Sequence, residues 1–81
     1  MFYVYLLISQ LYPEQIYIGY TKDVMQRLKT HNNGGSPHTA KYKPWDLIVF
    51  FGFANQSTAL NFEKYLKSQS GRAFIKKRFL R

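Results

Sequence analysis

The residues of this chain best suited to chemistry are two tyrosines, Tyr5 and Tyr17, together with Arg27, His31 and Glu63. An arginine can grip a phosphate through its planar guanidinium, and a histidine can orient a neighbouring hydroxyl or carry its proton. A tyrosine beside a cation can act as a base, because the cation favours the phenolate. A single carboxylate can hold Mg²⁺, which keeps several of its waters. Together, such a set would suit phosphodiester hydrolysis.

Arg27 and His31 are expected on one face of a helix. Val24, Arg27, Leu28 and His31 stand at i, i+3, i+4 and i+7, so the two polar side chains share a stripe with two apolar residues. Two interpretations stay open. The polar heads either reach water from the edge of the stripe, or point into a site.

Two strands are expected to bring the tyrosines together. Phe2–Ser9 and Ile16–Tyr20 are rich in aromatic and β-branched residues. The short connection between them makes the strands antiparallel neighbours. With that connection centred on Leu11, Tyr5 and Tyr17 fall near each other across the ladder.

The next segments predict a helix and a third strand. Thr21 is expected to cap the helix, with Asp23 in its first turn, and the helix should end near His31 or Asn32. The polar, basic segment 38–44 is expected to be a loop. Trp45–Phe53 is almost continuously apolar, which predicts a strand and favours the central, most buried position.

A second long helix, about Thr58–Ser68, is expected to carry Glu63 at the edge of its apolar stripe. Glutamate is almost never buried unless it is paired. We therefore expect either an ion pair with Arg27 or a nearby lysine, or a carboxylate ready for a divalent cation. Ser70-Gly71 is expected to end this helix. A short basic helix, Arg72–Arg81, should follow, with a partly apolar face formed by Ala73, Phe74, Lys77 and Arg78.

Length and composition indicate one small domain covering residues 1–81. The absence of cysteine excludes disulfides and thiolate metal sites and favours a cytoplasmic protein. No apolar run approaches the roughly 20 residues that span a bilayer, so no membrane association is expected. The apolar N-terminus is interpreted as a strand and not as a signal peptide.

The charge balance indicates a polyanionic partner. Twelve Lys and Arg face four Asp and Glu, which leaves a net charge of +8, as is typical of nucleic-acid-binding domains. The alternatives are a merely soluble basic protein or one attracted to acidic lipid. The candidate nucleic-acid contacts are Lys22, Lys41, Lys43, Lys67, Lys76, Lys77 and Arg78.

The ordered motifs resemble those of the GIY-YIG nucleases. Tyr3-Val4-Tyr5 is similar to the first motif of that family, and Tyr17-Ile18-Gly19 matches the second. Arg27 follows ten residues after Tyr17, His31 comes one helical turn later, and Glu63 stands on the next long helix. The segment from Asn33-Gly34-Gly35 to Thr39-Ala40 resembles the loop of the small, single-domain branch. The resemblance extends from Tyr3 to about residue 70.

The resemblance implies an α+β fold, with a three-stranded antiparallel sheet flanked by helices. It implies Mg²⁺- or Mn²⁺-dependent cleavage of DNA that leaves a 5′-phosphate. Tyr17 would be the general base with Tyr5 in support, Arg27 would stabilise the phosphate, and His31 would tune the tyrosines. Glu63 would bind the metal, and Gly19 would leave room for a tight turn before the helix.

Three departures from the family pattern bear on function. Tyr3 stands where the family name has Gly, and no Asn follows Glu63, since Lys67 and Ser70 occupy that region. Only a basic tail follows, so we expect recognition of DNA shape, such as a branch, flap or nick, and not of sequence. The alternative is a catalytically silent nucleic-acid-binding module of the same fold. A basic domain that docks on a partner protein is a third hypothesis.

Overall fold

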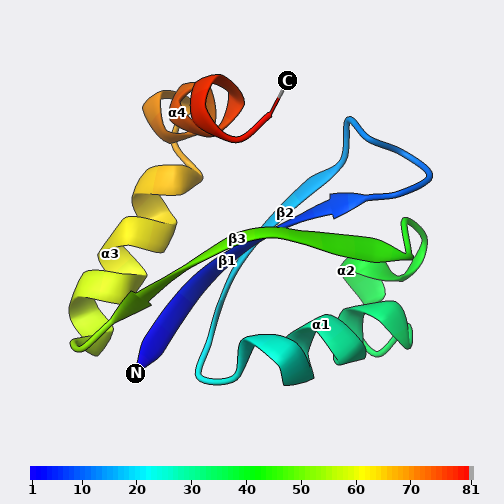
Figure 1. Cartoon of the computed structure of the whole chain (residues 1–81), viewed down its shortest axis with the longest axis horizontal. Helices are drawn as coiled ribbons and strands as arrows, with labels where there is room; N and C mark the ends of the chain where they lie inside the picture. The colour runs from blue at the N-terminus through cyan, green and yellow to red at the C-terminus, as the bar shows by residue number, and fades with distance from the viewer. Residues whose placement is uncertain (81) are drawn as a thin grey trace.

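The computed structural model describes residues 1–80. Its elements are β1 (Phe2–Ser9), β2 (Ile16–Thr21), α1 (Val24–Asn32), α2 (Pro37–Ala40), β3 (Trp45–Phe53), α3 (Gln56–Leu66) and α4 (Gln69–Arg78). The three strands form one antiparallel sheet, with α1 and α2 on one face and α3 and α4 on the other (Figure 1). The predicted α+β fold is therefore confirmed.

The central strand is β1, and the prediction that Trp45–Phe53 would be central was wrong. The strand order is β2-β1-β3, so β1 bonds to both neighbours and β3 lies at an edge. β3 is almost continuously apolar because apolar clusters lie on both faces of the sheet, although Phe50 and Gly52 are exposed, and not because it is paired on both sides. A run of apolar residues indicates that both faces of a strand are covered. It does not indicate whether the strand has a hydrogen-bonded neighbour on each side.

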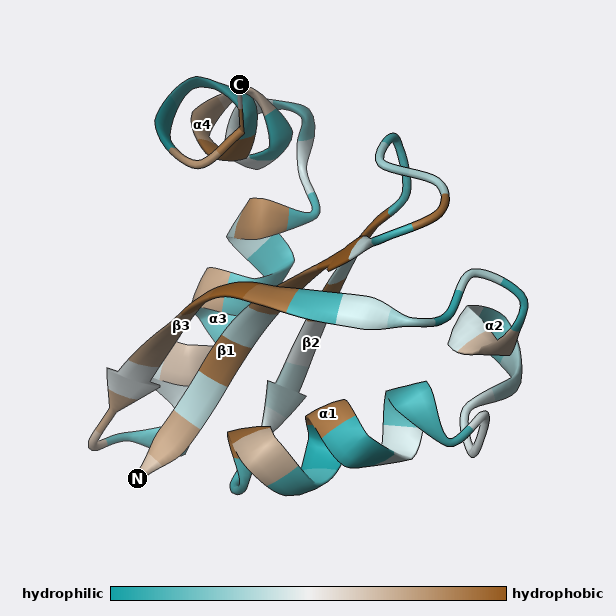
Figure 2. Cartoon of the chain, turned by 45° about the vertical axis from the view of Figure 1, so that its right-hand side comes forward, coloured by the Kyte–Doolittle hydropathy of each residue, from teal (hydrophilic) through white to brown (hydrophobic). Residues whose placement is uncertain are grey.

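Residues that alternate along the strands pack into two separate apolar clusters, one on each face of the sheet. On the α3 and α4 side, Val4, Leu6 and Ile18 pack with helical residues such as Ala59 and Leu66. On the α1 and α2 side, the cluster consists of Tyr5, Leu7, Val24 and Trp45, with Tyr17 and Leu28 packed against it. The hydrophobic colouring of Figure 2 runs along β1 and β3, between the two layers of helices. Both tyrosines of the candidate site therefore belong to the α1 side.

The register of β1 and β2 differs from the expected one by two residues. Tyr5 pairs with Gly19, and Tyr17 pairs with Leu7. Because side chains alternate with a period of two, this shift leaves Tyr5 and Tyr17 on the same face as diagonal neighbours. Their ring centroids are 6.1 Å apart, so the predicted proximity is confirmed.

Several helix boundaries differ from expectation. The N-cap of α1 is Asp23, whose carboxylate accepts from the backbone N–H of Gln26 at 3.1 Å. Thr21 instead ends β2 and accepts from the backbone N–H of Asp23. Helix α3 begins and ends two residues earlier than expected, with Asn55 as its N-cap. The segment predicted to be a loop contains the short helix α2, which begins at Pro37.

Gly71 lies inside helix α4 and does not end α3 there. Ser68 caps α4, and its hydroxyl accepts from the backbone N–H of Gly71 at 3.1 Å. A Cβ at position 71 would collide with the backbone of Tyr65 and Leu66, so glycine permits close approach of the last turn of α3. The buried face of α4 is formed by Gly71 and Ile75.

The predicted apolar face of α4 was therefore wrong in part. Phe74 is partly buried, whereas Ala73, Lys77 and Arg78 are exposed. Within the described part of the chain, no helix has the length and apolar character needed to cross a membrane.

Candidate active site

The ring of Tyr5 lies directly over Gly19 of the neighbouring strand. A Cβ at position 19 would collide with the phenol ring and hydroxyl of Tyr5. Gly19 was expected to free a tight turn before the helix, but it lies within β2, and its role is to make room for this ring. The tyrosine side chain is thereby held against the sheet and is only 1% exposed.

A buried hydrogen-bond chain runs from Tyr5 through His31 to Thr39. The Tyr5 hydroxyl lies 2.9 Å from His31 Nε2, and His31 Nδ1 lies 2.7 Å from Thr39 Oγ1. The Thr39 hydroxyl donates to the carbonyl of Ser36 at 3.3 Å, so it accepts from His31 Nδ1–H. His31 Nε2 is then the unprotonated nitrogen and accepts from Tyr5. The histidine is a neutral acceptor with a fixed tautomer.

Burial favours the neutral forms of both titratable groups in this hydrogen-bond chain, His31 and Tyr5. The pKa of His31 is lowered, first because the ring is desolvated and second because the Arg27 cation is near. The pKa of Tyr5 is raised by desolvation, which outweighs the opposing effect of a hydrogen bond with Arg27. Tyr5 is consequently a proton donor to His31 and resists ionisation.

Arg27 and Tyr17 complete the polar surface next to this chain. Hydrogen bonding to Tyr5 is the largest cause that raises the pKa of Arg27, and Tyr17 contributes in the same direction. The Tyr17 ring is 4.7 Å from the His31 ring, centroid to centroid. Tyr17 and Arg27 are partly exposed, whereas His31 is fully buried. A substrate can thus meet Tyr17 and Arg27, with Tyr5 and His31 beneath them.

Glu63 approaches the site from the other layer of helices. Its charge is a minor cause of the raised pKa of Tyr5, behind desolvation by burial and the nearby Tyr17. Glu63 Oε2 lies 3.2 Å from Lys67 Nζ, and the glutamate side chain is 19% exposed. The expected ion pair is therefore made with a lysine one turn along the helix, and not with Arg27. The Glu63 carboxylate therefore still reaches solvent.

The residues present fit a hard divalent cation held mainly by water. Glu63 is a single, partly exposed carboxylate, and Mg²⁺ often binds through one or two carboxylates and several waters. Among residues 1–80 no three acidic or histidine side chains cluster as a complete ligand set. A tightly coordinated metal such as structural zinc does not fit, whereas a water-rich Mg²⁺ or Mn²⁺ does.

The candidate nucleic-acid contacts are spread over both layers of the molecule. Lys41 and Lys43 follow helix α2, whose Thr39 binds His31, and Lys22 precedes α1. Lys76, Lys77 and Arg78 belong to α4, on the opposite side of the sheet. All of these side chains are exposed, and Lys67 is engaged by Glu63. The structure therefore brings Tyr5, Tyr17 and His31 together with Arg27 beside them, whereas the seven cations are spread over both layers.

Neither Thr39 nor Asn32 was predicted from the sequence to have a role in the site. Thr39 is buried and selects the tautomer of His31. Asn32 bonds both the backbone N–H and the carbonyl of Trp45, at 2.6 and 3.1 Å, and so fastens the end of α1 to β3. The only signal in the sequence for Thr39 was its place after the Asn-Gly-Gly segment. The contacts of Thr39 with His31 and of Asn32 with Trp45 follow no helical or strand spacing, so the sequence pattern could not predict them.

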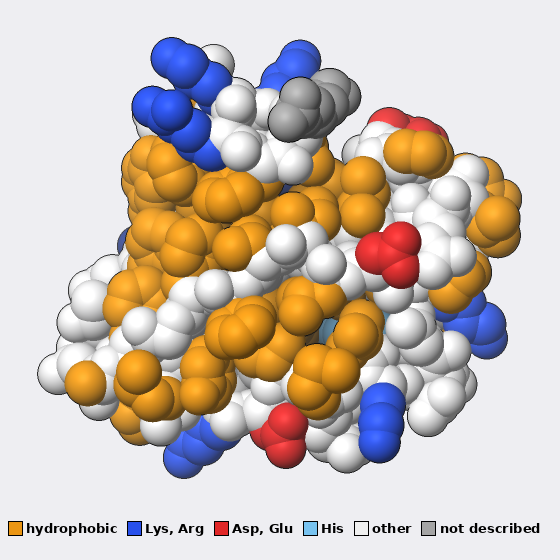
Figure 3. All heavy atoms as spheres, viewed as in Figure 1, with side chains coloured by type: hydrophobic (Ala, Val, Ile, Leu, Met, Phe, Trp, Pro, Cys, Tyr) orange, Lys and Arg blue, Asp and Glu red, His pale blue; other side chains and the backbone are white. Residues whose placement is uncertain are grey.

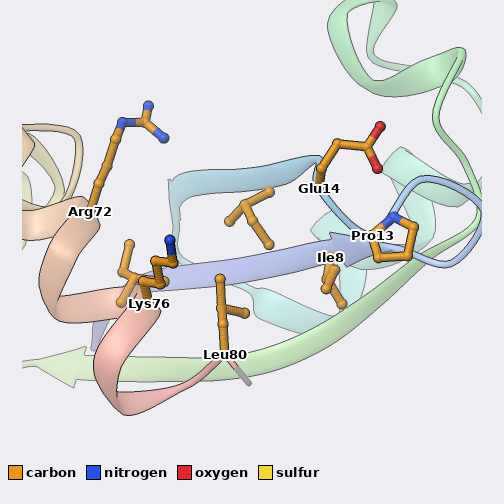
Figure 4. A pocket seen from close by; sticks show the side chains of 8 residues that line it. Ile8, Pro13, Glu14, Arg72, Lys76 and Leu80 are labelled. Carbon is orange, nitrogen blue, oxygen red and sulfur yellow. The ribbon is translucent and has the colours of Figure 1, made fainter.

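A second cavity lies away from the candidate site, between α4 and the connection from β1 to β2. Figure 4 shows Arg72 and Lys76 on one wall and Glu14 on the other. The cavity measures about 580 Å³, and its floor is apolar. Ile8 and Ile16 belong to the face opposite Tyr5 and Tyr17, so this cavity is separated from the candidate site by the sheet.

With this geometry established, comparison with known proteins defines the class. The profile of the GIY-YIG catalytic domain matches residues 1–78 of the chain. The chain therefore belongs to the GIY-YIG family and carries its catalytic domain. The resemblance seen in the motifs is thereby confirmed.

Particular relatives fall into two groups. The structure-specific endonuclease subunit SLX1 homolog of Caenorhabditis briggsae is 44% identical over 69 residues, which cover 74% of this chain and 16% of that protein. The structure-specific endonuclease subunit SLX1 of Debaryomyces hansenii is 40% identical over 71 residues, 79% of this chain and 20% of that protein. A UPF0213 protein of Haloquadratum walsbyi is 39% identical over 67 residues, 82% of this chain and 75% of that protein.

The extent of these matches differs between the groups. The chain spans between about one sixth and one fifth of the two SLX1 proteins and three quarters of the UPF0213 protein. What the SLX1 proteins do as whole molecules therefore bears on this chain only through the catalytic domain.

Proposed function

We propose that this chain is a divalent-metal-dependent DNA endonuclease that recognises the shape of its substrate. The observation that supports this most directly is the buried chain from Tyr5 through His31 to Thr39, beneath Tyr17 and Arg27. Burying the polar ring of a histidine requires two compensating hydrogen bonds. A surface that only binds DNA does not need such a buried, neutral histidine of fixed tautomer. It suits a site in which proton positions matter.

Tyr17 is the better general base of the two tyrosines. A general base must reach the water whose proton it takes, and Tyr17 is partly exposed whereas Tyr5 is 1% exposed. Burial raises the pKa of Tyr5, and its hydroxyl already donates to His31. Tyr5 and His31 therefore position Arg27 and the Tyr17 ring, while Tyr17 accepts the proton.

Arg27 stabilises the phosphate, and Glu63 holds the metal. The guanidinium lies beside both tyrosine hydroxyls, keeps its charge at every physiological pH, and can form two parallel bonds to phosphate oxygens. A bound Mg²⁺ or Mn²⁺ would supply Lewis-acid stabilisation of the charge that develops on the phosphate. Glu63 can turn from Lys67 to a cation, since the side chain of Lys67 is 50% exposed and the ion pair is correspondingly weak.

DNA as substrate and recognition of its shape rest on charge and on the relatives. A net charge of +8 attracts a polyanion such as DNA. The SLX1 relatives carry the name structure-specific endonuclease. We extend that property to this domain, and we place its action in the cytoplasm, in DNA repair or recombination.

The test is cleavage of end-labelled plain, nicked, flapped and branched DNA with Mg²⁺, Mn²⁺ or EDTA. We expect metal-dependent cutting, fastest on a branched or flapped substrate, and a loss of about 10²-fold or more in the variant Glu63→Gln. Glu14→Gln is the matched control, because Glu14 is an exposed acid on the connection between β1 and β2. Its rate should equal that of the wild type.

The same assay identifies the alternative. Binding to all substrates without cutting, under every metal and with Glu63→Gln indistinguishable from wild type, would contradict the nuclease proposal. The chain would then be a nucleic-acid-binding module that retains the residues of the site. Equal cutting in EDTA would contradict the metal dependence alone.

A further inference from the structure

The outer edge of β3 is an open hydrogen-bonding surface. In Figures 1 and 3 the molecule is seen from this edge, with β3 in front of the other strands. In Figure 3 a band of white atoms, which are backbone or polar side chains, crosses this face with hydrophobic side chains above and below it. An open edge of this kind is a template for another strand, and proteins commonly protect it with lysine, proline or a bulge.

The half of β3 from Val49 to Phe53 carries none of the usual charged or proline protection. It reads Val-Phe-Phe-Gly-Phe, without a charge or a proline. A bulge between Leu6 and Leu7 interrupts the pairing near Ile48, so the five residues after it form a regular ladder with β1. At the other end of the strand, the Asn32 side chain already occupies the outward N–H and carbonyl of Trp45.

The alternation of the ladder identifies which backbone groups point outward. Ser9 N–H bonds Gln15 on the β2 side, so Leu7, Tyr5 and Tyr3 also turn their backbone groups to β2. Phe50 and Gly52, the β3 partners of Tyr5 and Tyr3, therefore turn theirs away from β1. Among residues 1–80, no backbone or side-chain hydrogen bond outside the sheet and the helices engages either residue.

The side chains of the same two residues are complementary. The Phe50 ring is 50% exposed, and Gly52 is exposed and has no side chain. A Cβ at Gly52 would lie 3.2 Å from the Tyr3 ring and 3.4 Å from the Met1 side chain, so both side chains lie against this exposed residue. An aromatic ring directly across a strand pair from a glycine covers the exposed backbone of the glycine and stabilises the pairing.

We propose that β3 pairs antiparallel with β3 of a second copy of this chain, with Phe51 on the two-fold axis. This register places Phe50 opposite Gly52 of the copy, and Gly52 opposite its Phe50. Each pair exchanges both backbone bonds, so all eight outward groups of these residues are satisfied by four hydrogen bonds. The interface is isologous, as a two-fold dimer requires.

Charge and area also favour a second copy as the occupant, in the form of a weak dimer. The paired segment itself holds no charge, although Lys22 and Asp23 line the hollow beside Phe50 and each copy carries +8 overall. Five residues of a strand bury less than the roughly 1,200 Å² of a standard interface, which indicates reversible association. Tyr17 lies on β2, the strand farthest from β3, so both candidate sites would stay open.

The test is sedimentation equilibrium from about 10 µM to about 1 mM protein. We expect the average mass to rise from 9.6 kDa toward twice that value, and to rise further in higher salt, which screens the repulsion between copies. Phe50→Lys should weaken association about tenfold or more by placing a charge at the edge. Leu11→Lys is the control, since Leu11 is 67% exposed on the connection between β1 and β2.

Amide exchange followed by NMR tests the register independently of any variant. The N–H groups of Phe50 and Gly52 should exchange more slowly as the wild-type concentration rises, whereas the N–H of Leu11 should not change. A monomer across the whole concentration range overturns the proposal and leaves the edge to a strand from another protein. A dimer that Phe50→Lys does not weaken, with no protection at Phe50 and Gly52, overturns it equally.

Discussion

The two tyrosines of the site have the same side chain in opposite environments. Tyr5 is buried over Gly19 and donates to His31, while Tyr17 is partly exposed beside Arg27. We expect Tyr17→Phe to lower the cleavage rate about 10²–10⁴-fold, because it removes the hydroxyl that acts as the base. Stability should stay nearly unchanged, because Tyr17 is partly exposed. Single-turnover cleavage and chemical denaturation measure the two effects.

Tyr5→Phe is the matched comparison, and it should act mainly on stability. It leaves the buried His31 Nε2 without a donor, which costs about 1–3 kcal/mol of unfolding free energy. Its cleavage rate should fall less than that of Tyr17→Phe. Equal losses of rate in the two variants would refute the assignment of the base to Tyr17.

His31 makes the stability of the domain sensitive to acid. Its pKa is lowered in the folded protein by burial and by Arg27, so the unfolded chain binds the proton more readily. The unfolding free energy should be highest above the ordinary histidine pKa of about 6.5 and decrease as the pH falls below it. The slope for one proton is at most about 1.4 kcal/mol per pH unit.

Denaturant titrations between pH 5 and pH 8 check this dependence. His31→Gln should flatten the curve, whereas His38→Gln should retain the slope, because His38 is exposed on α2. A slope that persists in His31→Gln would assign the acid sensitivity to another group.

At the level of elements, the junction between α3 and α4 depends on a glycine. A methyl group at position 71 would meet the backbone of Tyr65 and Leu66, which cannot move without shifting the end of α3. We expect Gly71→Ala to lower the unfolding free energy by about 1–3 kcal/mol despite the better helix propensity of alanine. Ser70→Ala, one residue earlier and exposed, should change it by less than about 0.5 kcal/mol in thermal or chemical unfolding.

The strands show which parts of a fold a sequence can predict. The bounds of β1 and β3 follow from their aromatic and β-branched runs and are confirmed. The prediction that β3 is the central strand was wrong, because β3 lies at an edge of the sheet. Apolar residues indicate that the faces of a strand are covered, and they do not indicate how many strands pair with it. The register of β1 and β2 was two residues off, yet the faces were right, since an even shift preserves the alternation.

The candidate site also contains residues that the sequence predicts and residues that it does not predict. The helical spacing of Arg27 and His31 predicted one shared face, and the structure places His31 against Tyr5 with Arg27 beside it. Thr39 could not be predicted in this way, because its bond to His31 depends on how the chain returns after α1. Spacing left open whether Arg27 or a nearby lysine pairs with Glu63, and the structure shows that the partner is Lys67; metal binding by Glu63 stays a prediction.

At the scale of the whole molecule, the sheet separates two groups of cations. Lys41 and Lys43 are close in sequence to Thr39 and lie on the α1 side with the candidate site, whereas Lys77 and Arg78 are on α4 across the sheet (Figure 1). A duplex held over Tyr17 and Arg27 meets the first group before the second. Cleavage and binding should therefore depend mainly on the cations of the α1 side.

This separation predicts a difference in the salt dependence of DNA binding. For B-DNA, log K falls with log salt with a slope of about −0.9 for each phosphate neutralised. We expect the double variant Lys41→Gln and Lys43→Gln to reduce the magnitude of the slope by about 1.8, while Lys77→Gln with Arg78→Gln reduces it by clearly less. Fluorescence anisotropy of labelled duplex between about 50 mM and 200 mM salt measures both. An equal reduction in the two double variants would mean that DNA wraps both faces, and a larger one for α4 would move the binding surface away from Tyr17.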